Sequence, residues 1–357
     1  MGKNIVMCLD GTGNEVKAKG ATNVFKIVEL LDLTDPTKQV VYYDPGVGTF
    51  ASPSAWSWPA RMLSRMGGLA LGHGLRQNLG EAYGYLMRAW EPGDHVFVFG
   101  FSRGAYTARA LCGMLHRIGL LRPGSENLIP YALRVYARRT GKDSDLTRPE
   151  GWARMNRFAA ALSVRTQPKS VAFPIAFLGV FDTVKATGLL GRDIHWPYTN
   201  QLPNVAVVRH AVSIDERRRP YRECLVPVRP AGSDPRVTET WFAGVHSDVG
   251  GGFDDGPELG KVSMRWMLDG AVAEGLLIRS RRYAGRYAVS DSDALGAVHK
   301  MGWLWALATF RRRPVPSGAR VHASVRTRIS TDEAYAKNVP PAVVWDEDAW
   351  LPQAPTA

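Results

Sequence analysis

Residues 96–105 of the chain read Val96-Phe97-Val98-Phe99-Gly100-Phe101-Ser102-Arg103-Gly104-Ala105. The apolar residues before Gly100 are β-branched or aromatic, which is typical of a buried strand. The residues after Gly104 are helix formers at helical spacing, and no proline follows before Pro123. A serine between two such elements, with a glycine two positions away on each side, lies on a sharp turn that exposes its hydroxyl. The pattern predicts that Ser102 is a nucleophile; the alternative is a serine in an ordinary glycine-rich turn.

The first 250 residues alternate short apolar strands with helical stretches. This alternation predicts an α/β fold with a mostly parallel central sheet that is flanked by helices. Strands are expected at residues 4–9, 39–43, 95–99, 174–181 and 239–245, and helices at residues 23–31, 75–89, 105–118 and 205–214. Because functional side chains gather at the carboxyl ends of parallel strands, the residues that follow each strand are the candidates for a site.

The chain of 357 residues is long enough for one large domain, and residues 1–357 are interpreted as a single domain. Two regions interrupt the alternation of strands and helices. Residues 51–74 are rich in Gly, Ser, Pro and Trp and predict a lid loop. Residues 120–170 predict a helical insertion with arginine-rich faces, and from about residue 275 the pattern weakens into basic segments.

Two classes of segment are not expected. No run of about 18 apolar residues suggests a transmembrane helix. The first residues lead directly into the strand at 4–9 without a signal-peptide pattern, so a cytoplasmic location is expected. Three widely spaced cysteines, Cys8, Cys112 and Cys224, are interpreted as buried thiols, not as a disulfide or zinc framework.

The formal net charge of +12 indicates an anionic partner, such as a phospholipid surface or nucleic acid, or only a solvated basic surface. One basic run, Arg311-Arg312-Arg313, follows a tryptophan-rich stretch at residues 303–310. Tryptophan beside arginine suits a membrane interface, where the rings lie at headgroup depth and the guanidinium groups meet phosphate. The alternative for this stretch is a core helix with a solvated end. Nothing in the composition indicates an oligomeric state.

A serine hydroxyl needs a histidine base and an acid that orients the histidine. Asp182 follows the apolar stretch 177–181, and His246 lies where the strand at 239–245 meets a glycine-rich loop. The chain order Ser102, Asp182, His246 is that of α/β-hydrolases. These three residues are the predicted catalytic triad.

Each assignment has an alternative. His210 is a second candidate base, but its expected position in the middle of a helix predicts a packed, supporting residue. Asp215 and Asp248 compete with Asp182 for the role of the acid. Asp248 lies two residues after His246 and is expected to support that histidine.

Acyl transfer also needs N–H donors for the oxyanion, usually one from the residue after the nucleophile and one from an early strand-end loop. Arg103 would supply the first N–H. Gly11 and Thr12 are the candidates for the second, since the Asp10-Gly11-Thr12-Gly13-Asn14 loop lets backbone N–H groups converge. The alternative for this loop is a plain Asp-Gly turn. Asp10 would orient the loop or, in a different interpretation, bind a metal.

Two other functions remain open. Asp10, Asp182, His246 and Asp248 all follow predicted strands, so together they could bind a divalent ion for phosphoester hydrolysis. No metal-binding spacing supports this alternative, and no metal or cofactor is expected. The second alternative is a module without catalytic activity that docks on an anionic membrane or on nucleic acid, although no specific nucleic acid is expected.

Six ordered motifs carry a resemblance to a known family. They are Asp10-Gly11-Thr12-Gly13-Asn14, Tyr43-Asp44-Pro45-Gly46-Val47-Gly48-Thr49, Gly100-Phe101-Ser102-Arg103-Gly104-Ala105, Gly179-Val180-Phe181-Asp182-Thr183-Val184, His210-Ala211-Val212-Ser213-Ile214-Asp215-Glu216 and Gly244-Val245-His246-Ser247-Asp248-Val249-Gly250-Gly251. The set resembles the DUF2235 family, which includes the catalytic domain of the Tle1-type phospholipase effectors of type VI secretion.

The resemblance implies an α/β-hydrolase fold and a serine lipase or phospholipase with phospholipase A-type acyl cleavage. It implies Ser102 as nucleophile, Asp182 as acid and His246 as base. The expected partner is a phospholipid or another acyl ester, with peripheral membrane contact. Export by a route that needs no signal peptide is a further expectation. The effectors usually carry additional membrane-anchoring or lid modules, whereas this chain is expected to comprise little more than the catalytic domain.

Overall fold

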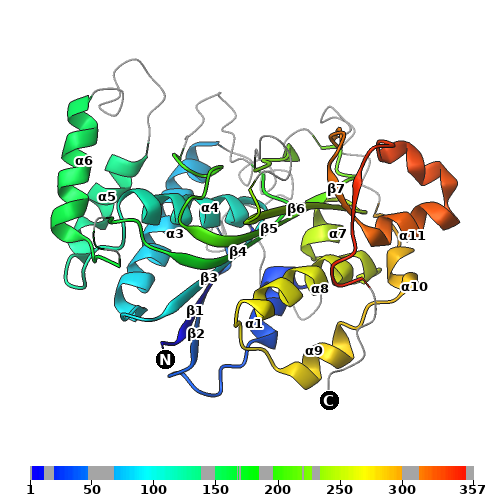
Figure 1. The fold of residues 1–357 in the computed structure, drawn as a ribbon, viewed down its shortest axis with the longest axis horizontal. Helices are drawn as coiled ribbons and strands as arrows, with labels where there is room; N and C mark the ends of the chain where they lie inside the picture. The colour runs from blue at the N-terminus through cyan, green and yellow to red at the C-terminus, as the bar shows by residue number, and fades with distance from the viewer. Residues whose placement is uncertain are drawn as a thin grey trace, which may run out of the picture.

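The computed structural model describes residues 2–11, 20–46, 68–137, 149–166, 168, 170–184, 196–218, 221–226, 234–299 and 313–350. Its centre is an eight-stranded sheet in the order β2-β1-β3-β4-β5-β6-β7-β8, and the neighbouring strands of this sheet pair in parallel. Helices cover both faces of the sheet (Figure 1). The predicted class, an α/β fold with a parallel central sheet, is confirmed.

The strands are β1 (Asn4–Leu9), β2 (Gln39–Asp44), β3 (His95–Phe101), β4 (Ile175–Phe181), β5 (Val205–Ser213), β6 (Val237–Phe242), β7 (Arg320–His322) and β8 (Val344–Asp346). The α-helices are α1 (Asn23–Leu30), α3 (Gly68–Ala89), α4 (Ser102–Arg117), α5 (Ile129–Tyr136), α6 (Pro149–Leu162), α7 (His246–Gly250), α8 (Glu258–Ala273), α9 (Ser280–Arg286), α10 (Asp291–Ala294) and α11 (Ala323–Thr331). Two 3₁₀ turns, Glu126–Leu128 and Glu333–Asn338, complete the described elements.

The five predicted strands are present, with ends that shift by up to three residues. The predicted helix at 205–214 is wrong, because Val205–Ser213 forms β5 between β4 and β6. Its valines are β-branched, so they are stiff in a helix and pack well on a pleated surface. The two short strands β7 and β8, in the region where the pattern weakens, extend the sheet beyond β6.

Alternate residues of the central strands point to opposite faces of the sheet and pack into two separate hydrophobic layers. On β1, Ile5 and Met7 pack with α3, α4 and α5, whereas Val6 and Cys8 pack with α1 and α8. Both faces of a parallel sheet are therefore buried, which explains why its strands are continuously apolar. The three cysteines are free and buried, as predicted.

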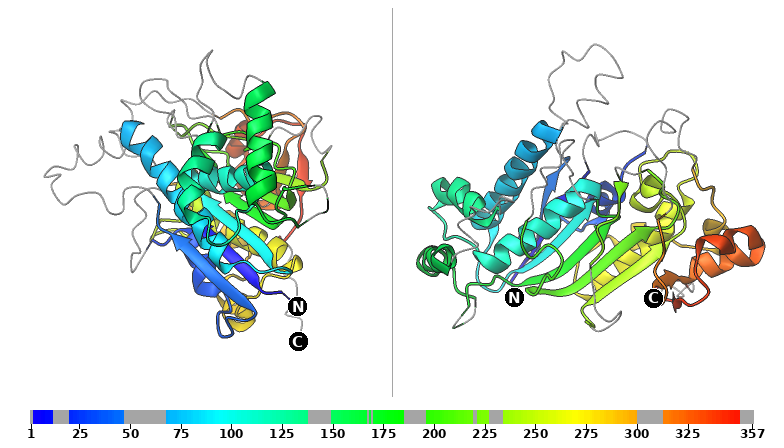
Figure 2. Two further views of the ribbon diagram at one scale, coloured as in Figure 1. Left: turned by 90° about the vertical axis from the view of Figure 1, so that its left-hand side faces the viewer. Right: turned by 90° about the horizontal axis from the view of Figure 1, so that it is seen from above.

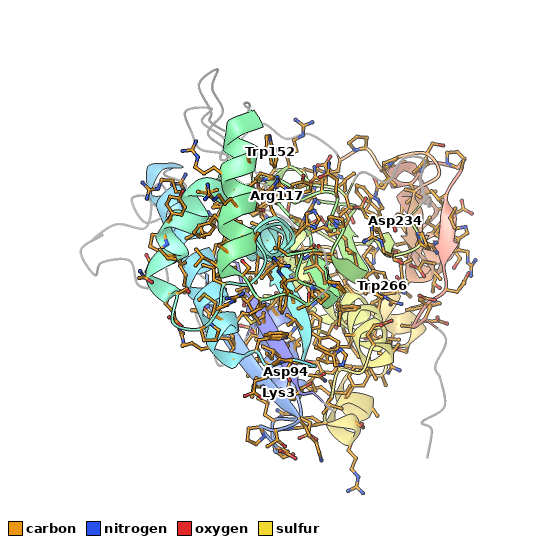
Figure 3. All side chains as sticks on the ribbon, turned by 60° about the vertical axis from the view of Figure 1, so that its left-hand side comes forward. Lys3, Asp94, Arg117, Trp152, Asp234 and Trp266 are labelled. Atoms are coloured by element: carbon orange, nitrogen blue, oxygen red, sulfur yellow. The ribbon has the colours of Figure 1, made fainter. Side chains whose placement is uncertain are left out.

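The predicted helical insertion at 120–170 contains α5 and α6. Figure 2 shows α6 and α11 at opposite ends of the sheet. The guanidinium of Arg117, at the end of α4, lies over the Trp152 ring of α6 at 4.0 Å, and both residues are labelled in Figure 3. Of the predicted lid, residues 51–67 lie outside the described residues, and the remainder begins α3 and is helical.

None of the described helices has the length and apolarity that a membrane crossing requires. Figure 3 also labels Lys3 and Asp94, whose side chains form an ion pair of 2.6 Å. This pair ties the start of β1 to the turn before β3, at the amino-terminal edge of the sheet. The predicted site residues lie at the opposite, carboxyl-terminal edge.

Candidate active site

The turn that carries Ser102 joins β3 directly to α4. Phe101 is the last residue of β3, Ser102 is the first of α4, and the backbone of Ser102 has a φ of 59°. Few residues other than glycine adopt this left-handed conformation, which costs about 1 kcal/mol. Gly104 allows the turn to pack closely, because a Cβ there would lie 2.2 Å from the carbonyl oxygen of Leu9. The sequence therefore builds a strained elbow with a serine at its tip.

Asp182 takes the equivalent position on the neighbouring strand. Phe101 and Phe181 pair in the register of β3 and β4, so Ser102 and Asp182 are the next residues on adjacent parallel strands. The Asp182 side chain is fully buried. Its Oδ1 accepts a hydrogen bond of 3.0 Å from the backbone N–H of Ser213, and its Oδ2 lies 2.6 Å from Nδ1 of His246.

His246 begins α7, four residues after the end of β6. Its imidazole lies between two aromatic rings: it stacks on Phe101 at 4.6 Å and meets the edge of Tyr221 at 4.9 Å. Glycine at position 250 leaves space for the Phe101 ring in this stack. A Cβ at position 250 would lie 1.9 Å from that ring. The residue before Ser102 thus fixes the plane of the histidine.

The electrostatics of the pair favour a charged Asp182 and a neutral His246. Burial acts to raise the pKa of Asp182, but the charge of Arg313 and the hydrogen bond from His246 outweigh it and lower that pKa. Burial lowers the pKa of His246, and Asp182 and Glu216 oppose this effect without cancelling it. An ionised carboxylate only accepts hydrogen bonds, so Nδ1 of His246 carries the proton and Nε2 is left as a basic nitrogen.

Ser102 lies next to Asp182 in the sheet register, because each follows a residue of the pair Phe101–Phe181, and its side chain is nearly buried. Among the contacts of the described residues there is no hydrogen bond between its hydroxyl and His246. Such bonds are often long in enzymes without substrate and tighten in the complex. The arrangement has the parts of a serine nucleophile with an oriented base.

The alternative base His210 is held by hydrogen-bonding groups on both sides of its ring. It lies in β5, not in the predicted helix, and is fully buried. Its Nδ1 lies 2.8 Å from Glu239 Oε2, and its Nε2 accepts a 3.2 Å hydrogen bond from the N–H of Thr183. Both ring nitrogens are therefore engaged, and the bond to Thr183 fixes the turn that follows Asp182.

Neither alternative acid contacts the imidazole of His246. Asp248 Oδ1 lies 2.5 Å from Nδ1 of His299, and its Oδ2 accepts from the N–H of Val245 at 2.8 Å. Asp248 thus caps the start of α7 and positions His246 through the backbone. Asp215 Oδ2 accepts from Gly244 N–H and from the Tyr335 hydroxyl.

The loop after β1 lies against the elbow. Asp10 Oδ2 accepts from the hydroxyls of Thr22, at 2.5 Å, and Tyr43, at 3.0 Å, and Oδ1 accepts from the N–H of Gly11 at 2.6 Å. Asp10 therefore orients the loop. The N–H of Gly11 already has this partner, which leaves Thr12 as the other predicted donor, outside the described residues.

Four residues were considered as metal ligands: Asp10, Asp182, His246 and Asp248. The structure brings only Asp182 and His246 into contact, while Asp10 binds hydroxyl groups and Asp248 binds His299. Among the described residues no group of three or more His, Cys, Asp or Glu side chains is arranged to hold a metal ion. Arg313 beside Asp182 would also repel a cation.

The basic run that ends at Arg313 was expected to meet a lipid surface or to form the solvated end of a core helix, and Arg313 itself fits neither expectation. The side chain is 3% exposed, and its Nη1 lies 2.5 Å from Asp182 Oδ1. The other residues of the tryptophan-rich stretch, 303–312, lie outside the described residues. No local pattern predicts this contact, because an arginine at the end of a basic run is typical of a solvated surface.

A parallel sheet with helices on both faces and a serine on a strand-to-helix elbow defines an α/β-hydrolase-like protein. Within this class, residues 3–270 match the model of a family described as "T6SS, Phospholipase effector Tle1-like, catalytic domain". The chain belongs to this Tle1-like catalytic-domain family, as the six motifs indicated.

Similar proteins include an uncharacterized protein of Saccharomyces cerevisiae, which is 35% identical over 232 residues. This match covers 64% of the chain and 33% of the yeast protein, so the chain spans about a third of that relative. A crystal structure of an uncharacterized Pseudomonas aeruginosa protein is 17% identical, with a TM-score of 0.48 over 95% of this chain and 56% of that one. A Tle1 effector bound to the VgrG spike is 16% identical, with a TM-score of 0.35 over 71% and 52%.

Proposed function

We propose that this protein is a serine hydrolase that cleaves carboxylic esters of phospholipids with Ser102, His246 and Asp182 as its triad. The observation that carries the proposal is the buried Asp182–His246 pair, 2.6 Å long, packed against the residue that precedes Ser102. The family supports a lipid ester as substrate. A binding module would need neither the strained serine nor the oriented histidine.

In the proposed reaction Ser102 Oγ attacks the ester carbonyl while Nε2 of His246 takes the hydroxyl proton. His246 then returns this proton to the departing alcohol, which leaves an acyl group on Ser102. A water molecule, deprotonated by the same nitrogen, cleaves the acyl-enzyme and releases the fatty acid. Asp182 keeps the imidazole in the tautomer that this sequence requires and stabilises its charged form.

The oxyanion that forms on the substrate carbonyl needs backbone donors. We assign one to the N–H of Arg103, in the first turn of α4, where the helix dipole also favours negative charge. The second donor is assigned to the loop at Gly11 and Thr12, since the carbonyls of Leu9 and Asp10 lie against Gly104. Thr12 is favoured over Gly11, whose N–H already binds Asp10.

The substrate places the enzyme at a membrane surface, which it would reach from the cytoplasm or after export. The net charge of +12 suits an anionic lipid surface. Acyl cleavage of the phospholipase A type is the reaction that the triad would perform there.

The proposal is tested by a fluorophosphonate probe and a panel of phospholipid vesicles, each with and without a chelator. We expect covalent labelling at Ser102 and release of free fatty acid, both unaffected by the chelator. Release of phosphate that the chelator abolishes, without labelling, would support the metal phosphoesterase instead. Vesicle binding without turnover would support the binding module.

The low pKa of His246 predicts the pH dependence of the reaction. Burial lowers this pKa below the ordinary value of about 6.5. The base acts when it is neutral, so lowering its pKa extends activity to lower pH. The acid limb of kcat/KM for a soluble ester is expected to have its midpoint below pH 6.5. A midpoint at or above 6.5 would contradict the buried environment of His246.

A further inference from the structure

Arg313 contacts the proposed acid with two nitrogens at once. Its Nη1 lies 2.5 Å from Asp182 Oδ1, and its Nη2 lies 3.1 Å from Oδ2. Both side chains are buried. A guanidinium that binds both carboxylate oxygens fixes the plane of the carboxylate as well as its distance. The Oδ2 atom that Arg313 touches is also the atom that binds His246.

The same guanidinium holds two other parts of the site. Nη1 donates to the Ser213 hydroxyl at 2.7 Å, and Nη2 donates to the backbone carbonyl of Tyr221. Ser213 lies at the end of β5, and its N–H binds Asp182. The Tyr221 ring packs on His246. Arg313 therefore links the acid to both of these supports.

Arg313 reaches the site from outside the family match, which ends at residue 270. It lies seven residues before β7, which adds to the sheet through the pairs Thr240–Arg320 and Trp241–Val321. Tyr335, from the same carboxyl-terminal segment, donates to Asp215 Oδ2 at 2.5 Å. The segment 313–350 thus extends the sheet beyond β6 and contacts the site region through Arg313 and Tyr335.

We propose that Arg313 is a positioning residue. It holds the Asp182 carboxylate in the orientation that binds Nδ1 of His246, and its positive charge offsets the negative charge next to the imidazole. The proposal rests on the proposed function in one respect, that the Asp182–His246 pair acts as the base. It assigns part of the site to the carboxyl-terminal segment, beyond the family's catalytic-domain match.

The charges around His246 predict what the loss of Arg313 would do. Two carboxylates face the histidine, Asp182 after β4 and Glu216 after β5, and Glu216 binds Arg218 at 2.7 Å. Arg313 is the counter-charge of Asp182, with Glu223 3.5 Å from its Nε. Without Arg313 the negative charge near the imidazole is no longer balanced, so protonated His246 is stabilised. The Ser213 N–H still holds Asp182 in contact with His246.

The test compares Arg313→Gln, which removes the charge, with Arg313→Lys, which keeps the charge but loses the two-pronged contact. Arg217→Gln is the matched control, because Arg217 lines the same cavity as Arg313 but is exposed. We expect kcat for a soluble ester to fall about 10- to 100-fold in both Arg313 variants. The acid-limb midpoint should rise by about one pH unit in Arg313→Gln only. Arg217→Gln should match the wild type.

A second readout does not depend on turnover. The imidazole of His246 is titrated by NMR in Ser102→Ala and in Ser102→Ala with Arg313→Gln, which also shows whether each variant is folded. A higher His246 pKa in the double variant supports the role of Arg313, even if the wild type hydrolyses no ester and the proposed function fails. A His246 midpoint equal to or below that of Ser102→Ala overturns the role of Arg313, whether or not the wild type is active.

Discussion

Replacing Ser102 with alanine is expected to lower kcat for ester hydrolysis by about 10⁴- to 10⁶-fold, because nothing else at the elbow can form the acyl-enzyme. Covalent labelling by the fluorophosphonate should vanish. The fold should persist, since the hydroxyl of Ser102 makes no hydrogen bond to a described residue and alanine keeps the Cβ. The measurements are initial rates on phospholipid vesicles and on a soluble ester, with a thermal melt of each variant.

Ser330→Ala is the control for this experiment. Ser330 is exposed near the end of α11, and its hydroxyl binds only the carbonyl of Thr327 in the described part of the chain. It should retain the rate of the wild type. If Ser102→Ala kept its turnover, the serine mechanism would be wrong. A folding defect in this variant would instead appear as a lower melting temperature.

The elbow adds a stability signature to the same experiment. The left-handed backbone of Ser102 costs about 1 kcal/mol of folding free energy, and Ser102→Gly should recover part of this stability. A variant that is inactive and yet as stable as the wild type, or more so, would show that the serine is kept for chemistry. Activity and stability measured together thus distinguish a strained nucleophile turn from an ordinary glycine-rich turn.

Local sequence was sufficient for the central part of the fold and for the proposed triad. Val96 to Phe99 predict a strand because they are apolar and bulky, and Asp182 and His246 became candidates because each follows such a strand. In a parallel sheet the ends of these strands meet at one edge. The strand pattern thus places Asp182 and His246 at the same edge of the sheet, whereas the contact between them depends on the order of the strands.

The structural features that the sequence did not predict have a common cause. Each depends on contacts between residues that are distant in the chain. The β-branched valines of β5 favour a strand, but Arg209 and His210 interrupt the apolar run, and the pairing with β4 and β6 decides the structure of this segment. Asp248 binds His299, 51 residues away, and Arg313 binds Asp182, 131 residues away. No local pattern specifies which distant polar group a buried charge will meet.

Replacing Asp182 with asparagine is expected to have the second largest effect, a loss of about 10⁴-fold in kcat, because the amide no longer holds His246 in the reactive tautomer. The same change removes the counter-charge of Arg313. Breaking a buried ion pair on one side costs about 3–5 kcal/mol, so the free energy of unfolding should fall by this order. Steady-state kinetics and denaturant unfolding measure the two effects separately.

Asp234→Asn is the matched control for the stability effect. Asp234, labelled in Figure 3, forms a 2.5 Å ion pair with Arg236, but both side chains are about a third exposed. Since exposed pairs contribute about 0–1 kcal/mol, this variant should unfold almost like the wild type. A large loss in Asp234→Asn, or none in Asp182→Asn, would contradict the assignment of a buried, uncompensated charge.

The double variant Asp182→Asn with Arg313→Gln separates stability from catalysis. Removing both partners leaves no unpaired buried charge, so it should recover part of the stability that Asp182→Asn alone loses. It should recover none of the activity, because asparagine still cannot orient His246. If turnover returned together with stability, the loss in Asp182→Asn would be a folding defect, and Asp182 would not be the acid of the triad.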